Sequence, residues 1–474
     1  MRFHIIIAGA ACAALSWGCS AVKKCVEPQL DIPQAYVQAP QDSLTIADME
    51  WWRFYGDSTL CRMIKTTLEH NKDMLAAAAR VERSRQMYRI SKAELLPEIG
   101  GKAAADYETN DYYGGKSSRD AEFDLKLTIG WEIDLWGNLR WARRKGEAEY
   151  LASVEDERAL RMTLISEVAS AYYRLTALDD ELDIVKNTLQ TRQEGVKQAK
   201  LRYEGGLTSE TVYQQAQVEY ASTAALIPEL EHQISVAENV LALLMGKYPD
   251  WKVERDWHSN SILEDVRIPS GISSELLLRR PDVRAAEQRL KSAMAAVGMA
   301  YADRFPRLVI DLTGGLENDA LRGFLRSPFS YVAGALTGPI FGFGRKQAKY
   351  KAAISAYDEA RYKYEQKVLE VFKETDDAVS AYKKSRERVE LKRALRDASY
   401  KYMNLSRLQY RSGSVMYLDV LDAQRHYLEA QISLGNAIRD EHLSLVQLYK
   451  TLGGGWNYVD ESVSKAKPAK TKAK

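Results

Sequence analysis

The feature that most constrains the fold of this chain is an internal repeat. Four landmarks of the first half recur in the second: Leu96-Pro97 as Phe305-Pro306, Trp136-Gly137 as Phe343-Gly344, Glu167 as Glu374, and Arg202-Tyr-Glu-Gly-Gly206 as Gln409-Tyr-Arg-Ser-Gly413. Their separation stays between 207 and 209 residues, which indicates duplication of one unit. We therefore expect two pseudo-equivalent halves, although 474 residues would by length alone suggest roughly three independent domains.

Each half contains an alternating pattern typical of β-strands. Between Ala121 and Leu135 apolar or small residues alternate with polar ones, which predicts a long strand with one apolar and one polar face. A weaker alternation starts at Ile99, and a turn-rich stretch from 110 to 115 separates the two. The second half repeats this pattern less regularly. We expect strand hairpins at about 99–135 and about 306–341.

A long helical pattern follows each predicted hairpin. Apolar residues recur at alternating spacings of four and three from Leu164 to Leu189, and a similar seam runs from Tyr357 to Tyr382. Without proline, each helix can extend to the glycine landmark, about 100 Å at ~1.5 Å per residue. Gly206 and Gly413 suit the left-handed position after a helix. Thr208 or Ser209, and Ser414, are the expected caps of returning helices, which predicts helical hairpins at about 137–247 and 344–452.

The N-terminus has the pattern of an export signal. Arg2 is followed by an apolar stretch from Ile5 to Leu15 and then by Gly18-Cys19. Small Gly18 before Cys19 resembles a bacterial lipobox, so residues 1–18 are expected to be removed and Cys19 to be acylated. Ser16 and Trp17 depart from that box, and Cys12 is a weaker competing site. The alternative is an ordinary signal peptide cleaved nearby.

The strand number indicates an assembly. After the first 20 residues no apolar run approaches the ~18 residues of a spanning helix, which excludes a polytopic helical membrane protein but not a barrel. Known single-chain membrane barrels start at about eight strands, and an open sheet edge cannot persist in lipid. If the four strands cross a membrane, several chains must share one barrel, and three chains would give twelve strands. The alternative is a soluble coiled-coil protein with surface hairpins.

Five motifs carry a resemblance to a known family. They are Leu276-Leu-Leu-Arg-Arg-Pro-Asp-Val-Arg-Ala-Ala-Glu287, Trp131-Glu-Ile-Asp-Leu-Trp-Gly137, Gly338-Pro-Ile-Phe-Gly-Phe-Gly-Arg345, Tyr417-Leu-Asp-Val-Leu-Asp-Ala-Gln424 and Leu452-Gly-Gly-Gly-Trp456. Each motif is weak alone, but all five lie in order on the duplicated scaffold. The chain resembles the TolC-type outer-membrane factors of bacterial tripartite efflux pumps, in particular their lipoprotein branch (OprM-like and CusC-like).

The resemblance implies an α+β membrane protein that works as a homotrimer. A twelve-stranded β-barrel would cross the outer membrane and continue as an α-helical coiled-coil tunnel in the periplasm. The chain would then divide into a signal peptide (1–18), a lipidated equatorial segment (19–56), a first repeat (57–247), an equatorial insert (248–270), a second repeat (271–452) and a C-terminal segment with a basic tail (453–474). The implied partners are a periplasmic adaptor, an inner-membrane RND-type transporter and outer-membrane lipids.

The resemblance also implies an entrance gate at the helix tips. The helix expected to begin at Ser414 contains Asp419 and Asp422, which match acidic positions that form rings at the family's periplasmic entrance. Six carboxylates around one axis would attract cations and repel anions. The alternative is that an aspartate early in a helix interacts with the helix dipole.

Two further expectations concern closure and docking. Tyr410 matches a tyrosine of the family's closed-state network, although it also suits an ordinary aromatic contact at a helix end. The family's arginine and aspartate partners fall on Val415 and Val212, so closure is expected to depend on packing around Leu418. The expected adaptor-docking tips are Gly205, Gly206, Leu207, Thr208, Gly413 and Ser414.

The remaining sequence features exclude several functions. A formal charge of +2 argues against nucleic-acid binding. The six histidines show no metal-ligand spacing, and no nucleophile–base pair or phosphate loop is present, so we expect no enzyme, cofactor or metal site. The sequence leaves undecided whether Cys25 and Cys61 form a disulfide. The leading functional hypothesis is a passive efflux duct; metal-ion efflux, type I protein secretion and a structural envelope lipoprotein are the alternatives.

Overall fold

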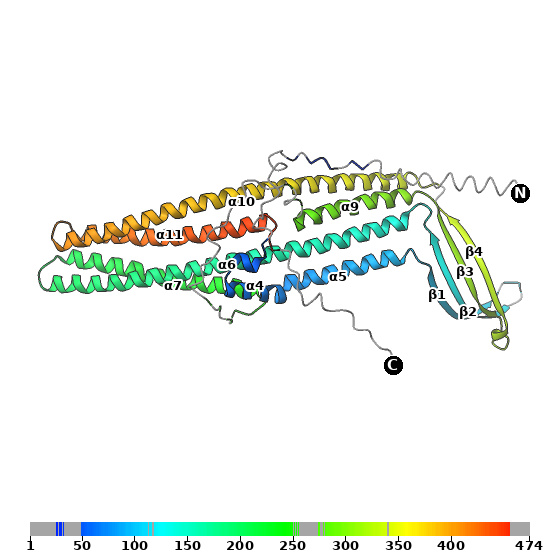
Figure 1. The fold of residues 1–474 in the computed structure, drawn as a ribbon. Coiled ribbons are helices and arrows are strands. Elements are labelled where there is room, and N and C mark those ends of the chain that lie inside the picture. The colour runs from blue at the N-terminus through cyan, green and yellow to red at the C-terminus, as the bar shows by residue number, and fades with distance from the viewer. Residues whose placement is uncertain are drawn as a thin grey trace. The chain divides into compact units, whose positions relative to one another are not determined.

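The structure is a computed structural model (Figure 1). It describes residues 25–26, 28–30, 32, 49–111, 113–115, 118–249, 251, 253, 255, 274, 278, 280–338 and 341–455. The expected signal peptide, Cys19, residues 256–270 of the insert and the basic tail lie outside the described residues. No helix in the described part of the chain has both the length and the apolar character needed to cross a membrane.

Four strands form one antiparallel sheet in the order β1-β2-β3-β4 (Figure 1). The strands are β1 (Glu98–Asn110), β2 (Ser118–Ile133), β3 (Arg307–Asn318) and β4 (Pro328–Thr337), and a short 3-10 helix, η3 (Phe324–Arg326), lies between the last two. The two predicted hairpins are therefore confirmed. Pairing of β2 with β3, with Gly130 opposite Asp311, joins the two halves of the chain, so β1 and β4 are the edges of the sheet.

The sheet has the two different faces that the alternation predicts. Leu125, Leu127 and Leu312 share the apolar face, where their side chains are exposed to a large degree. On the other face Asp124 is buried and its carboxylate lies 2.7 Å from the ammonium of Lys126, which also approaches Glu317 at 3.3 Å. An exposed apolar face opposite a polar, ion-paired face is the pattern of a sheet between lipid and water.

The helices repeat in length as well as in order. Two short helices, α3 (Trp51–Tyr55) and α4 (Ser58–His70), come before the first of the helices that repeat. The shorter helices before each hairpin, α5 (Lys72–Ala93) and α9 (Pro281–Ala302), both have 22 residues. The long helices α6 (Asn138–Glu204) and α10 (Arg345–Arg411) both have 67, and the returning helices α7 (Glu210–Leu244) and α11 (Tyr417–Thr451) both have 35.

The predicted heptad seams are buried. Val168, Leu175 and Val185 of α6 and Val371 and Thr375 of α10 are almost entirely inaccessible to solvent. Knobs at this spacing pack one helix against another in coiled coils, which explains how helices with many charged residues are held along their length. The prediction of the two seams is confirmed.

Both long helices end in the same turn. Gly206 and Gly413 have left-handed backbones with φ of 68° and 79°, as predicted. The Leu207 amide donates to Arg202 O at 2.7 Å, and the Ser414 amide donates to Gln409 O at 2.9 Å, so each turn satisfies carbonyls that the helix end leaves free.

One expected cap is wrong. Ser209 occupies the position before α7, although its side chain makes no capping hydrogen bond there. Ser414 does not begin α11, because its amide closes the end of α10 and its hydroxyl lies 3.1 Å from that of Ser412. The helix starts after Met416, whose amide donates to the carboxylate of Asp419.

The chain divides into two compact units, and each takes segments from both repeats. One unit comprises residues 1–30, 79–155 and 283–367 and includes the sheet; the other comprises 31–78, 156–282 and 368–474. In the second unit, Phe54 stacks on Tyr449 at 4.1 Å, and Asp57 both caps α4 and accepts a 2.8 Å hydrogen bond from the Tyr172 hydroxyl. The sequence repeats are therefore not separate folding units, because their helices pack against each other.

Candidate entrance gate at the helix tips

The helix tips expose apolar side chains on tightly closed turns. Leu207 follows the α6 turn and is 74% exposed, and Met416 precedes α11 and is 77% exposed. Tyr203 stacks on Tyr213 at 6.2 Å within the first hairpin. The expected tip residues Gly205, Gly206, Leu207, Thr208, Gly413 and Ser414 all lie in these two turns, where exposed apolar atoms can be covered by another molecule.

Tyr410 connects the two hairpins. Its ring lies 5.4 Å from that of Tyr417 in its own hairpin, and the guanidinium of Arg202, on α6, lies 5.4 Å from the Tyr410 ring centre. The structure therefore shows the ordinary aromatic contact at a helix end, combined with a cation–π contact to the other hairpin, and the closed-state role of Tyr410 stays a prediction.

Asp419 and Asp422 lie in the first two turns of α11. Because they are three residues apart, they share one face of the helix. Oδ2 of Asp419 accepts the Met416 amide at 2.9 Å, and Oδ2 of Asp422 lies 3.5 Å from Nε2 of His426. Asp419 thus has the local helix-start role that was the alternative to a gate. A solvent-exposed carboxylate can perform both functions, since a hydrogen bond leaves its charge in place.

A buried ion cluster lies further along the same helices, and the sequence interpretation missed it. Arg192 of α6 contacts Oε2 of Glu219, on α7, at 2.9 Å, and both side chains are only 6% exposed. Arg192 also donates to Glu219 O at 2.7 Å and to the Thr223 hydroxyl. From the other hairpin, Arg425 of α11 donates through Nε to Oε1 of Glu219 at 2.7 Å. One carboxylate therefore binds two guanidinium groups and joins the two hairpins.

The two arginines of this cluster differ in environment. Burial lowers the pKa of Arg192, and the Glu219 carboxylate opposes that effect. The hydrogen bond to Glu219 raises the pKa of Arg425, whose side chain is 48% exposed. Arg192 is thus a fixed internal partner, whereas Arg425 can exchange Glu219 for water.

A signal for the cluster was present in the heptad seam. The spacing that runs through Val185 and Leu189 next reaches Arg192, so a charged residue occupies a seam position. On α7, Glu219 lies between buried Ala216 and Thr223 at the same spacing. Charged or polar residues at seam positions commonly specify which helices pair and in which register. Interpreting Arg192 and Glu219 in this way would have predicted the site.

The cluster also changes the expectation for closure. The resemblance predicts that Val212 and Val415 replace the family's charged partners. The expected packing around Leu418 is not formed within one chain, because Leu418 is half exposed. The ionic connection between hairpins lies instead at Glu219 and Arg425. Cys25 and Cys61 are free thiols, so the structure contains no disulfide between them.

Comparison with known proteins identifies the family. The family described as outer membrane efflux protein matches residues 63–247 and 272–454. The chain is 29% identical over 456 residues to the cation efflux system protein CusC of Escherichia coli O157:H7, covering 94% of this chain and 98% of CusC. It is 31% identical to the solvent efflux pump outer membrane protein SrpC of Pseudomonas putida, covering 93% and 96%. The chain belongs to the outer membrane efflux protein family.

Solved structures agree with this membership. The outer-membrane channel OprN superposes with a TM-score of 0.80 at 28% identity, covering 91% of this chain and 99% of that chain. CusC superposes with a TM-score of 0.81 at 27% identity, covering 88% and 100%. As a member of the efflux protein family the chain is an outer-membrane channel, and the predicted family, efflux function and location are confirmed.

Proposed function

We propose that three copies of this efflux protein share one twelve-stranded barrel and form a passive exit duct. Two observations support the proposal. The four-stranded sheet has two edges without a partner in the described part of the chain, and its exposed apolar face suits lipid. Four strands are too few to close a membrane barrel, whereas a closed barrel leaves no edge in lipid. A periplasmic adaptor and an inner-membrane RND-type transporter would deliver the cargo.

The cargo is assigned to the pump rather than to the duct. Relatives of similar identity are named for cation efflux (CusC), solvent efflux (SrpC) and pyoverdine export (OpmQ of Pseudomonas putida, 31% identical). Since similar channels serve cargoes of such different chemistry, a binding site in the duct is not needed for selection. We therefore keep metal-ion efflux and protein secretion as uses of the same architecture.

The gate is proposed to combine an ionic latch with a ring of carboxylates. In each subunit Arg425 and Glu219 would hold the α11 hairpin against the α7 hairpin, and Asp419 and Asp422 would face the axis of the trimer. Leu418 and Tyr410 would close the space between hairpins by packing. The exposed tips at Leu207 and Met416 would receive the adaptor, and acylated Cys19 would anchor the N-terminus to the outer membrane.

Planar-bilayer recording of the detergent-extracted protein tests the duct. A duct gives discrete conductance steps from a particle of about three times the mature mass, whereas a structural lipoprotein gives none. The same assay tests the ring, because Asp419→Asn with Asp422→Asn removes charge but leaves an amide oxygen that can accept the Met416 amide. Cation preference and block by multivalent cations should fall together.

Asp419→Ala is the matched comparison, since it removes both the charge and the hydrogen bond at the helix start. Loss of that hydrogen bond costs about 1 kcal/mol. If the Asn double variant retains the cation preference of the unmodified channel, the carboxylates do not line the constriction and their role is confined to the helix start.

A further inference from the structure

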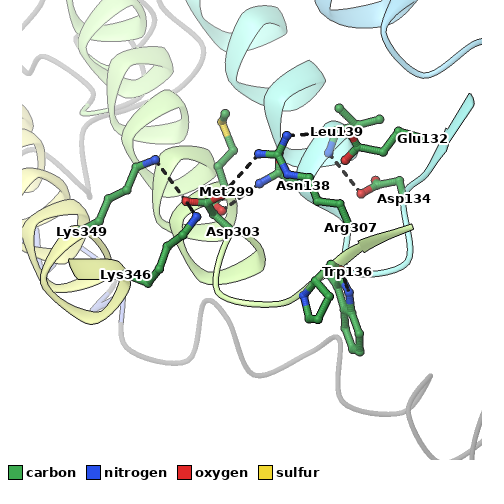
Figure 2. A network of polar contacts seen from close by, with 11 residues as sticks. Glu132, Asp134, Trp136, Asn138, Leu139, Met299, Asp303, Arg307, Lys346 and Lys349 are labelled. Carbon is green, nitrogen blue, oxygen red and sulfur yellow. Dashed lines mark hydrogen bonds and ion pairs between the residues drawn. The ribbon is translucent and has the colours of Figure 1, made fainter. Parts of the chain in front are cut away.

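The junction where β2 and β3 meet the helices contains a compact set of contacts between the two repeats (Figure 2). The Trp136 ring stacks on Phe305 at 4.6 Å, and its indole nitrogen donates to Pro306 O at 2.7 Å. Asn138, the first residue of α6, donates to Met299 O on α9 at 3.1 Å. We call this set the internal joint. Here the segment that connects β2 to α6 in the first repeat packs on the segment that connects α9 to β3 in the second repeat.

The strand registers show how one repeat maps onto the other. Glu98 lies opposite Gly130 in the first hairpin, and Arg307 lies opposite Thr337 in the second. The mapping thus adds 209 from β1 to β3, from Glu98 to Arg307, and 207 from β2 to β4, from Gly130 to Thr337. The same two offsets relate Pro97 to Pro306 and Gly137 to Gly344, so hydrogen bonding and sequence agree on one equivalence.

By this equivalence, the residues on both sides of the internal joint have counterparts that could form a second joint. These counterparts do not meet within one chain but stay exposed. Phe343 corresponds to Trp136 but is 91% exposed, next to exposed Phe341 with ring centres 4.7 Å apart. Leu96 corresponds to Phe305 and is also exposed. Phe343 has a positive φ of 46°, a conformation that is costly for a side chain of this size and is usually held by packing.

Charge supports the same pairing. In repeat two, Asp303 is bound by Lys346 at 2.6 Å and Lys349 at 3.2 Å. Its counterpart in repeat one is Glu94, and the positions equivalent to the two lysines are Leu139 and Ala142, so repeat one has no lysine at either position. Glu98, the first residue of β1, corresponds to Arg307 and adds a second negative charge. The residue that corresponds to Asn138 is Arg345, which forms no ion pair within the described residues.

We propose that a second copy of this chain occupies the second joint, with Phe343 and Arg345 of one copy against Leu96, Pro97 and Glu94 of the next. The proposal rests on the shared barrel of the proposed function and adds its register. Transfer of the β2–β3 pairing places β4 of one copy on β1 of the next, with Thr337 opposite Lys102, Ala335 opposite Ala104, and Val332 opposite Tyr107.

The transferred register passes an independent check. On β4, Val332 and Leu336 share the apolar face of the sheet because they lie opposite Leu312 and Leu308. On β1, Ala103 and Tyr107 share that face because they lie opposite Leu125 and Ala121. The transferred register pairs Leu336 with Ala103 and Val332 with Tyr107, so apolar meets apolar. A slip by one residue would place every apolar side chain of β4 beside the polar face of β1.

Cysteine cross-linking in outer membranes tests the register. In a background with Cys25→Ser and Cys61→Ser, the pair Ala335→Cys and Ala104→Cys replaces two small residues; its internal equivalents, Thr128 and Thr313, have hydroxyls 3.3 Å apart. Leu336→Cys with Ala103→Cys tests the opposite face, which covers both kinds of antiparallel site. Mild oxidation should convert at least one of the two double variants to a covalent trimer in denaturing gels, while each single variant stays monomeric.

The matched control is Ala333→Cys with Ala104→Cys, which again exchanges two alanines but is displaced by two residues. In the proposed register its Cβ atoms are diagonal neighbours about 7–8 Å apart, beyond the ~3.5–4.5 Å of a disulfide. Covalent trimers from this control alone, in a protein that still conducts, would overturn the register and leave the duct in place. Failure of all pairs, together with a monomeric particle, would overturn the shared barrel itself.

Charge reversal at the joint provides a second measurement. Arg345→Glu should lower the temperature at which the trimer separates in detergent, and adding Glu94→Lys should raise it again, because the ion pair is restored with opposite polarity. An additive loss from the two changes would mean that Arg345 and Glu94 of neighbouring copies do not meet, and would reject this joint.

Discussion

Arg425→Ala separates the latch from the remainder of the gate. The truncation removes the only guanidinium that reaches Glu219 from the α11 hairpin within the described residues. Glu219 keeps its 2.9 Å contact with Arg192, so no buried carboxylate loses all its partners. The variant should therefore fold and assemble, and the effect should be confined to the connection between hairpins.

The magnitude follows from exposure. Charge-assisted hydrogen bonds contribute about 1.5–3 kcal/mol, but exposed ion pairs contribute only about 0.2–1 kcal/mol. Because Arg425 is 48% exposed, we assign about 1 kcal/mol to each latch. That free energy changes the ratio of open to closed states about fivefold for one latch, and by about a hundredfold when three latches open together.

Single-channel recording measures this ratio directly, and entry of a large hydrophilic antibiotic into cells reports it in vivo. Arg388→Ala is the matched control, because Arg388 is 49% exposed and lies 2.6 Å from Asp440 within one hairpin, on α10 and α11. Its loss should leave gating unchanged. Equal open times for the Arg425 and Arg388 variants would refute the latch.

Glu219→Gln should behave differently from Arg425→Ala: it leaves a buried guanidinium without its carboxylate, so we expect a loss of about 3–5 kcal/mol in unfolding free energy as well as an open gate, measured by thermal denaturation. His442, beside the Tyr173 ring at 4.9 Å, has its pKa lowered to about 4 by burial. Since the unfolded imidazole titrates near 6.5, its contribution to stability is present above pH 6.5 and is lost as pH falls toward 4; His442→Gln should flatten this dependence by about 2–3 kcal/mol in denaturation at pH 7 and pH 4. Cys19→Ser should abolish acyl labelling while trimers still form, and persistent labelling would move the site to Cys12 or reject acylation.

The fold was largely predictable because its signals are periodic. Two-residue alternation from Ala121 to Leu135 and the seam from Leu164 to Leu189 each extend over many residues, so a local error cannot change the interpretation. The helix ends were predictable at Gly206 and Gly413, where only a left-handed residue fits. The start of α11 was not, because it depends on the preceding turn, in which the Ser414 amide donates to Gln409 O and the Met416 amide donates to Asp419.

The proposed gate was predictable only in part. Asp419, Asp422 and Tyr410 came from a family resemblance, whereas Glu219 and Arg425 are 206 residues apart and have no local signature of contact. Only three-dimensional packing brings α7 and α11 together at this point. Arg192 was the accessible clue, because a charged residue on an apolar seam requires a partner.

The two repeats have helices of equal length, but the residues at equivalent positions near the helix tips differ in charge. This difference determines which hairpin could take part in the proposed gate. With the 207-residue offset, Asp419 and Asp422 correspond to Val212 and Gln215, Arg425 corresponds to Val218, and Glu219 corresponds to His426. The two aspartates therefore occur only on the second helical hairpin of the chain, and the proposed latch has no equivalent elsewhere in the same chain. In the proposed trimer two kinds of hairpin would alternate around the axis. The charges around the entrance would then have three-fold rather than six-fold symmetry. Arg425 is the exposed cationic partner of Glu219 and Arg192 is the buried one, so water can compete with Arg425 for this carboxylate while the contact that joins α6 and α7 stays protected.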